Sequence, residues 1–214
     1  MKQDKEEKSN LFVLKLFFYF WLIIISFLYI FPYGRSEGPS MLPTAEHRSF
    51  YISIKHYYNF FEPNYGDIIS FNQNKNEAGL VKRVVGLPGD SIHIIDNNLY
   101  VNDKKIYNIK IKKKLFNIQK TNIPLTIYEE KNHINKTYNI LKNEFGLDCV
   151  DSRMDTFEKI SVPKDHYFVL GDNRYCSSDS RDFGPISKKS IKEKILFFYK
   201  PKSYQSWDWE HLNY

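Results

Sequence analysis

The most marked hydrophobic pattern is an unbroken apolar stretch near the start of the chain. Residues 11–31, LFVLKLFFYFWLIIISFLYIF, are apolar except for Lys15 and Ser26, whereas residues 1–10 are mostly charged or polar. A helix of this length measures about 31 Å, which matches the hydrocarbon core of a bilayer. A buried core helix would usually have a polar face, and this stretch has none. We therefore expect a transmembrane anchor at 11–31.

A cleaved signal peptide is the alternative interpretation of this stretch, because Gly34 and Ser36 form a pair of small residues after it. The apolar stretch is longer than the usual ~7–15 residues of such a peptide, and Pro32 and Tyr33 crowd the cleavage position. An uncleaved anchor is therefore the favoured interpretation.

The charges that flank the anchor predict its orientation. Four lysines precede or enter the apolar stretch, whereas Arg35 is the only cation close after it. Basic flanks tend to stay in the cytoplasm. We expect residues 1–10 to be cytoplasmic and everything after residue 35 to lie on the extracytoplasmic face of a cell (inner) membrane, with an organellar inner membrane as the alternative. The four lysines are Lys2, Lys5, Lys8 and Lys15.

Beyond the anchor, the chain reads as short strands rich in β-branched and aromatic residues and separated by turn residues. This pattern predicts a mainly β fold, with a hairpin in IHIIDNNLYVNDKKI. The strands are expected at 49–54, 67–71, 80–85, 91–95, 99–102, 166–170 and 191–199.

The patterning weakens in the middle of the chain, where lysine and asparagine are frequent. We expect a catalytic β-core at 36–106 and 161–200, interrupted by a smaller inserted lobe at 107–160 of undetermined fold, and followed by a surface tail at 201–214.

Charge and cysteine content limit which partners, metal sites and disulfides the chain could have. The net charge of +6 over 214 residues could suit an anionic membrane surface. The basic run at 110–114, KIKKK, is short and lacks interleaved aromatic residues, so no nucleic-acid partner is expected. Cys149 and Cys176 are too few for a zinc site, and either one disulfide or two free thiols fits the sequence.

The familiar metal and nucleotide motifs are absent. The sequence contains no HExxH, no CxxC, no GxxxxGK and no strand-bounded GxGxxG, so neither a metal nor another cofactor is expected. The six histidines are scattered. A Ser-His-Asp hydrolase remains an alternative, because such triads assemble in space and not in sequence.

Lys82 is the candidate for a different kind of serine activation, in which a neutral lysine is the base. Lowering the pKa of a lysine by about 3 units withholds about 4 kcal/mol from its charged form, which requires an apolar site. On a strand, Lys82 shares a face with Leu80 and Val84, while Arg83 points to the opposite face.

Two further stretches carry candidate chemistry. EGPSMLPT, residues 37–44, places a serine soon after the anchor. LGDNRYCSSDSRDFGPI, residues 170–186, has the Gly, Asp, Asn and Ser content of a tight loop, in which Asp179 and Arg181 could pair.

With EGPSMLPT, GDIISF, VKRVVGLPGD and LGDNRYCSSDSRDFGPI in this order, the chain resembles bacterial type I signal peptidases (leader peptidases) and their organellar inner-membrane relatives. The resemblance includes the anchor but little of 107–160. It implies a signal-peptidase-like catalytic β-core and a membrane-anchored serine endopeptidase with a Ser/Lys dyad, acting as a monomer. The implied reaction is removal of signal peptides from exported preproteins through an acyl-enzyme, and the implied partners are those peptides and membrane lipids.

The resemblance also assigns roles to individual residues. It makes Ser40 the nucleophile and Lys82 the general base. Ser177 would hydrogen-bond to the lysine and orient it, while Asp179 and Arg181 would brace the loop around them.

Substrate recognition is implied in the same way. The signal peptide would bind extended, with small residues at the first and third positions before the cut, and Met41 and Val81 would lie beside the pockets. The backbone N–H of Ser40 is the expected oxyanion donor. Many family members carry a serine as a second donor where this chain has Gly38, although others also carry glycine there, so the second donor is unassigned.

Two alternatives accompany this assignment. A specialised peptidase for pilin-like, conjugative or organellar precursors would share the same motifs. A catalytically inactive, membrane-tethered binding protein would keep the fold, but the joint presence of Ser40, Lys82 and Ser177 argues against it.

Overall fold

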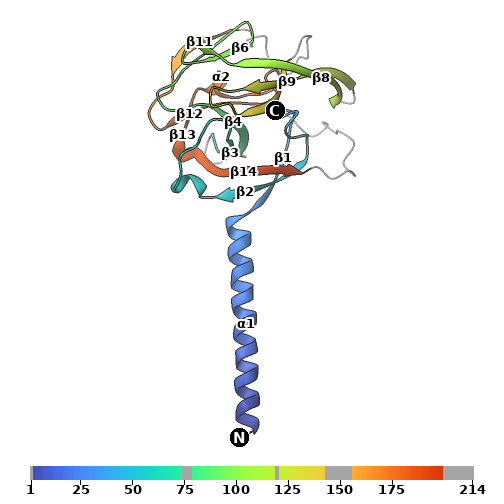
Figure 1. Cartoon of the computed structure of the whole chain (residues 1–214), viewed down its shortest axis with the longest axis vertical. Coiled ribbons are helices and arrows are strands. Elements are labelled where there is room, and N and C mark those ends of the chain that lie inside the picture. The colour runs from blue at the N-terminus through green and yellow to red at the C-terminus, as the bar shows by residue number, and fades with distance from the viewer. Residues whose placement is uncertain (1, 74–78, 119–120, 143–155, 200–214) are drawn as a thin grey trace.

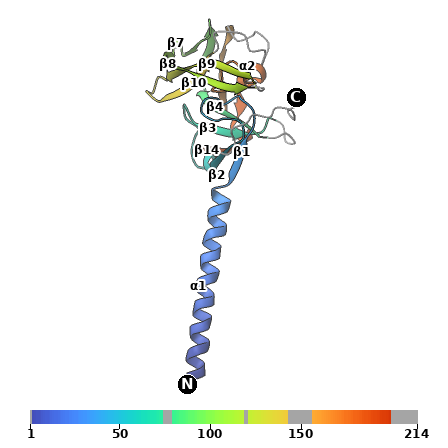
Figure 2. The same ribbon diagram turned by 90° about the vertical axis from the view of Figure 1, so that its right-hand side faces the viewer.

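The computed structural model describes residues 2–73, 79–118, 121–142 and 156–199. One long helix, α1 (Lys2–Ile30), leads into a β-rich domain and stands clear of it in two perpendicular views (Figures 1 and 2). Its segment Leu11–Ile30 is long and apolar enough to cross a membrane, and none of that segment is buried inside the protein. The expected N-terminal apolar helix is thus confirmed, and it ends one residue earlier than predicted.

The described part of the domain forms three antiparallel sheets. The largest has the strand order β1-β2-β14-β3-β4-β12-β13, the second β11-β5-β6-β7 and the third β10-β9-β8. The strands of the largest sheet are β1 (Tyr33–Ser36), β2 (Ser49–Lys55), β3 (Ile68–Phe71), β4 (Leu80–Gly86), β12 (His166–Leu170), β13 (Ile186–Ser187) and β14 (Ile191–Tyr199). Those of the smaller sheets are β5 (Ser91–Ile95), β6 (Asn98–Val101), β7 (Lys104–Lys105), β8 (Tyr107–Ile118), β9 (Thr121–Lys131), β10 (Thr137–Lys142) and β11 (Thr156–Ser161). Short helical turns occur at η1 (Tyr57–Asn59), α2 (Ser180–Phe183) and η2 (Lys188–Ser190).

The mainly β prediction is confirmed. The strands β5, β12 and β14 have the predicted bounds, β2, β3 and β4 differ from prediction by one residue at one end, and β6 begins and ends one residue earlier than predicted. The predicted hairpin is formed by β5 and β6, with Asp96 and Asn97 at φ 47° and 61° between them. Two adjacent residues with positive φ are the geometry of a tight hairpin turn, which asparagine and aspartate tolerate.

The segment 107–160, for which the sequence predicts no particular fold, also forms strands in its described residues. Strands β8, β9 and β10 form their own antiparallel sheet, whereas β11 pairs with β5 in the four-stranded sheet. The predicted lobe boundary at residue 160 falls inside β11, and the division into core and lobe stays a prediction. Cys149 and the predicted tail at 201–214 lie outside the described residues.

Strand β4 is buried on both faces because it runs between two apolar clusters. Val84 packs in a cluster with Ile69 and Phe71, while Val85 packs in another with Ile92. This central position in the sheet puts any side chain near the middle of β4 out of water.

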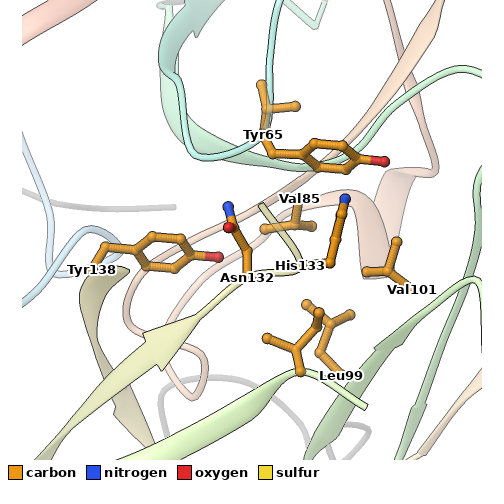
Figure 3. A pocket seen from close by; sticks show the side chains of 9 residues that line it. Tyr65, Val85, Leu99, Val101, Asn132, His133 and Tyr138 are labelled. Carbon is orange, nitrogen blue, oxygen red and sulfur yellow. The ribbon is translucent and has the colours of Figure 1, made fainter. Parts of the chain in front are cut away.

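A small cavity lies where the turn after β9 meets this core. It has a volume of about 10 Å³, which leaves room for about one water molecule, and Asn132 and His133 from the turn border it with Tyr65 and Tyr138 (Figure 3). The Nδ2 atom of Asn132 is buried without a hydrogen-bond partner in the described structure, so a water in this cavity would satisfy it.

Candidate active site

Ser40 lies on a tight turn that follows β1. Gly38 has φ 86°, a left-handed conformation that suits glycine, and the amide of Leu42 donates to the carbonyl of Pro39 at 3.0 Å. The side chain of Ser40 is half-buried at the domain surface. The turn therefore presents a hydroxyl ten residues after Ile30, where α1 ends.

Lys82, from the middle of β4, meets this hydroxyl. Its Nζ donates to Ser40 Oγ at 3.0 Å and to the carbonyl of Val81 at 3.1 Å. Only 3% of Lys82 is exposed. Burial lowers the pKa of Lys82 to about 8, a shift that Asp179 opposes and Arg181 reinforces. Lys82 is buried, as expected, and its contact with Ser40 brings together two residues 42 positions apart.

Asp179 and Arg181 form the expected ion pair. Asp179 is fully buried and accepts from Nε and Nη2 of Arg181 at 2.7 Å each. Its carboxylate also caps α2 and accepts from the amide of Gly171 at 2.9 Å. Burial would raise the pKa of Asp179, but Arg181 and the hydrogen bonds hold it below its usual value. The pair ties the two ends of the 171–181 loop together.

Ser177 is close to the dyad but does not make the expected hydrogen bond. It is 2% exposed, and its Oγ has no hydrogen-bond partner in the described structure. A Cβ added to Gly171 would clash with Ser177 Oγ and would lie 2.5 Å from the carbonyl oxygen of Ser40. Gly171 thus permits both serines to approach its backbone. A role for Ser177 in orienting Lys82 stays a prediction.

The remaining predicted residues surround the same turn. Met41 is 1% exposed, Val81 is half-buried, and the amide of Gly38 donates to Nδ1 of His47 at 3.0 Å. Gly38 has no hydroxyl and its amide already donates to His47, so the second oxyanion donor is still unassigned. Cys176, next to Ser177, is disulfide-bonded, which excludes two free thiols.

Sequence reasoning missed two contacts of the loop that follows β12. Arg83 points away from Lys82, as expected, but it is buried and donates to both carboxylate oxygens of Asp172, at 2.7 and 2.5 Å. Thr44 donates to the same carboxylate. Burial alone would lower the pKa of Arg83, and Asp172 raises it above the ordinary value.

The second missed contact is made by Asn173. Its amide donates to the carbonyl of Ser40 at 3.0 Å, and its side chain donates to that of Pro39 at 3.2 Å. The polar composition of the 170–186 stretch predicted a hydrogen-bonded loop, but no local signal named partners more than a hundred residues away.

Together these contacts define a simple chemical unit. A buried amine whose pKa is near neutrality lies within hydrogen-bond distance of a hydroxyl, which is the geometry of a nucleophile and its general base. A mainly β domain that follows an apolar N-terminal helix and contains a serine paired with a buried lysine has the organisation of a membrane-anchored serine peptidase.

Comparison with known proteins agrees with that class. Residues 9–200 match the family described as "Signal peptidase, peptidase S26", and the chain belongs to this family. It is 36% identical to signal peptidase I of Bacillus caldolyticus, over 81% of this chain and 82% of the relative. It is 30% identical to signal peptidase I P of Bacillus subtilis subsp. natto, over 92% and 94%.

A solved signal peptidase I from Enterococcus faecalis V583 is also similar, at 24% identity and a TM-score of 0.36. The match covers 64% of this chain and 97% of that structure.

Proposed function

We propose that this protein removes N-terminal signal peptides from exported preproteins, as a membrane-anchored serine endopeptidase with Ser40 as nucleophile and Lys82 as general base. The observation that carries the proposal is the 3.0 Å contact between Ser40 Oγ and the Nζ of a lysine that is almost fully buried. Membership of the signal peptidase family supplies the substrate class.

The reaction follows from the chemistry of the two groups. Neutral Lys82 takes the proton of Ser40 as its oxygen attacks the scissile carbonyl, and an acyl-enzyme forms as the lysine passes the proton to the leaving amine. Lys82 then activates a water, which releases the acyl group from Ser40. The backbone N–H of Ser40 is the proposed donor to the oxyanion.

The remaining residues support this pair. Asp179 and Arg181 brace the loop, Ser177 lies beside it, and Met41 and Val81 are proposed to border the pockets for small substrate residues. Because Ser40 and Lys82 both belong to one chain, the proposed enzyme works as a monomer.

The orientation proposed for the enzyme puts the catalytic domain on the extracytoplasmic face of the cell membrane. The basic flank before α1 supports a cytoplasmic N-terminus, and the unburied apolar surface of Leu11–Ile30 supports contact with lipid. A nucleophile this close to the end of the anchor reaches peptide bonds near the membrane surface. Protease added to the outside of intact spheroplasts should digest the domain, whereas digestion only after lysis would contradict the orientation.

The dyad is tested with detergent-solubilised full-length protein and a labelled preprotein. Ser40→Ala and Lys82→Ala should each abolish cleavage, because one removes the attacking oxygen and the other its base. Ser91→Ala and Lys159→Ala, which replace the same residue types on the four-stranded sheet, are matched controls that should cleave at the wild-type rate. Cleavage by either dyad variant at the wild-type rate would refute the assignment, and a wild-type protein that cleaves no preprotein would refute the function.

A further inference from the structure

Glu130 is a fully buried carboxylate on β9, in the three-stranded sheet. It is 0% exposed, and its two oxygens accept from Nη1 and Nη2 of Arg174 at 2.9 and 2.5 Å. Tyr138 on β10 donates to the same carboxylate at 2.8 Å. A buried charge is costly unless it is paired and hydrogen-bonded, and this bidentate ion pair meets both conditions.

Arg174, the partner of Glu130, is fixed along its whole length. Its Nε donates to the carbonyl of Gly171 at 3.2 Å, its amide donates to the carbonyl of Leu141 at 3.0 Å, and its carbonyl accepts from Arg181 at 2.7 Å. Burial alone would lower the pKa of Arg174, but the Glu130 carboxylate raises it above its ordinary value. Arg174 therefore joins the three-stranded sheet to the loop that contains the Asp179–Arg181 pair.

The residue before Arg174 completes the connection to the nucleophile. The Asn173 amide donates to the carbonyl of Ser40 at 3.0 Å, and its side chain donates to that of Pro39. On the other side of the loop, the amide of Leu141 donates to the carbonyl of Asp172 at 2.8 Å. The loop is thus held by β10 on one side and holds the Ser40 turn on the other.

The same sheet also packs directly on the Ser40 turn. Leu42, two residues after the serine, is fully buried in a cluster with Leu125, Ile127 and Leu141. Both a polar and an apolar contact therefore run from the three-stranded sheet to the turn that carries the hydroxyl. A misplacement of about 1 Å at a reacting group can cost on the order of 100-fold in rate.

We propose that Glu130 is a positioning residue for Ser40: by holding Arg174 it fixes the loop whose Asn173 amide sets the distance between the serine hydroxyl and Lys82. This role rests on the proposed Ser40–Lys82 dyad. Glu130 touches neither residue of the dyad, and it comes from a stretch that shows no sequence motif of the family.

The test substitutes Glu130 by glutamine in the full-length, detergent-solubilised protein. Glu130→Gln keeps the side-chain volume but removes the charge that holds Arg174. We expect kcat to fall about 10- to 100-fold while KM changes less than about twofold, because the reacting atoms need closer alignment than the pockets that bind the substrate and because Glu130 does not itself border those pockets. A double variant with Arg174→Gln should lose no more kcat than the single variant, since the two residues act as one unit.

Two controls separate positioning from general loss of stability. Glu129→Gln makes the same change on the opposite face of β9, and Asp90→Asn alters a buried carboxylate in the turn before β5 that accepts from Tyr65 at 2.6 Å. Both should keep the wild-type kcat when assayed well below their melting temperatures. Near-UV circular dichroism reports the folded fraction of each variant, so that kcat is expressed per folded molecule.

The outcomes are distinct. A kcat per folded Glu130→Gln molecule within twofold of wild type, or a loss confined to KM, would overturn the positioning role, and so would an equal loss in Asp90→Asn. Failure of the proposed function looks different, because the wild-type protein would then be inactive or Ser40→Ala would still cleave.

Discussion

The pH dependence of cleavage gives the most direct measure of Lys82 as a base. Only the neutral amine can accept the proton of Ser40, so the rate should follow the deprotonated fraction of Lys82. Burial lowers the pKa of this lysine to about 8. We expect kcat/KM to rise about tenfold per pH unit below pH 7 and to level off above about pH 8.

The size of the effect follows from this pKa. At pH 7 a lysine of pKa about 8 is neutral in about one molecule in ten, whereas one with the ordinary pKa of 10.5 is neutral in about one in three thousand. Burial of Lys82 therefore accounts for a factor of about 300 in the active fraction, equivalent to about 3 kcal/mol.

The assay measures kcat/KM from pH 5.5 to 9.5 with a preprotein whose cleavage site lacks titratable side chains. Lys82→Arg is the matched variant, because it keeps the positive charge and most of the length but cannot become neutral in this range. It should be inactive at every pH. The folded fraction is followed in parallel, so that the acid limb is not confused with unfolding.

Two results would refute this reasoning. A rate independent of pH between 6 and 8 would mean that Lys82 does not lose its proton in that range or is not the base. Cleavage by Lys82→Arg at more than about one hundredth of the wild-type rate would mean that another group activates Ser40.

Two further predictions concern Gly171 and the stability cost of Lys82. Gly171→Ala should abolish most activity and lower the free energy of unfolding by about 1–3 kcal/mol, because its Cβ would lie 2.5 Å from the Ser40 carbonyl oxygen. Gly79→Ala is the control, because the nearest atom to its Cβ would be 3.2 Å away, and it should cost little. Urea denaturation and cleavage assays measure both variants in parallel. Lys82→Met should be inactive but about 2–3 kcal/mol more stable at pH 7. The reason is that the pKa of Lys82 is lower in the folded than in the unfolded protein, so folding disfavours the charged amine. Below pH 8 the wild-type protein is destabilised by the full cost of this pKa difference, and it gains stability as the pH rises from 8 to 10.5. An unchanged Gly171→Ala activity, or a stability gap for Lys82→Met that does not narrow above pH 8, would contradict these expectations.

Local patterns in the sequence were enough to predict the helix and the strands that form from the preferences of neighbouring residues. A run that is apolar on every side can only be a helix in lipid or in a core, and α1 is the result. Short segments rich in β-branched and aromatic residues and bounded by turn residues placed β5, β12 and β14 with correct bounds. The strand pattern around Lys82 was also enough to separate its face from that of Arg83, because neighbouring residues on a strand point in opposite directions.

Tertiary structure decided everything that depends on which distant segments meet. The hydroxyl of Ser177, the expected partner of Lys82, makes no hydrogen bond in the described structure, whereas Asn173 donates to the Ser40 turn. Glu130, from the unpatterned middle of the chain, accepts from Arg174 in the same loop. A hydrogen bond or an ion pair depends on a few tenths of an ångström between atoms of separate strands, and residue periodicity does not encode that distance. The sequence alone therefore named a serine and a lysine, and only the packing of three sheets decided how far apart they lie and what holds them there.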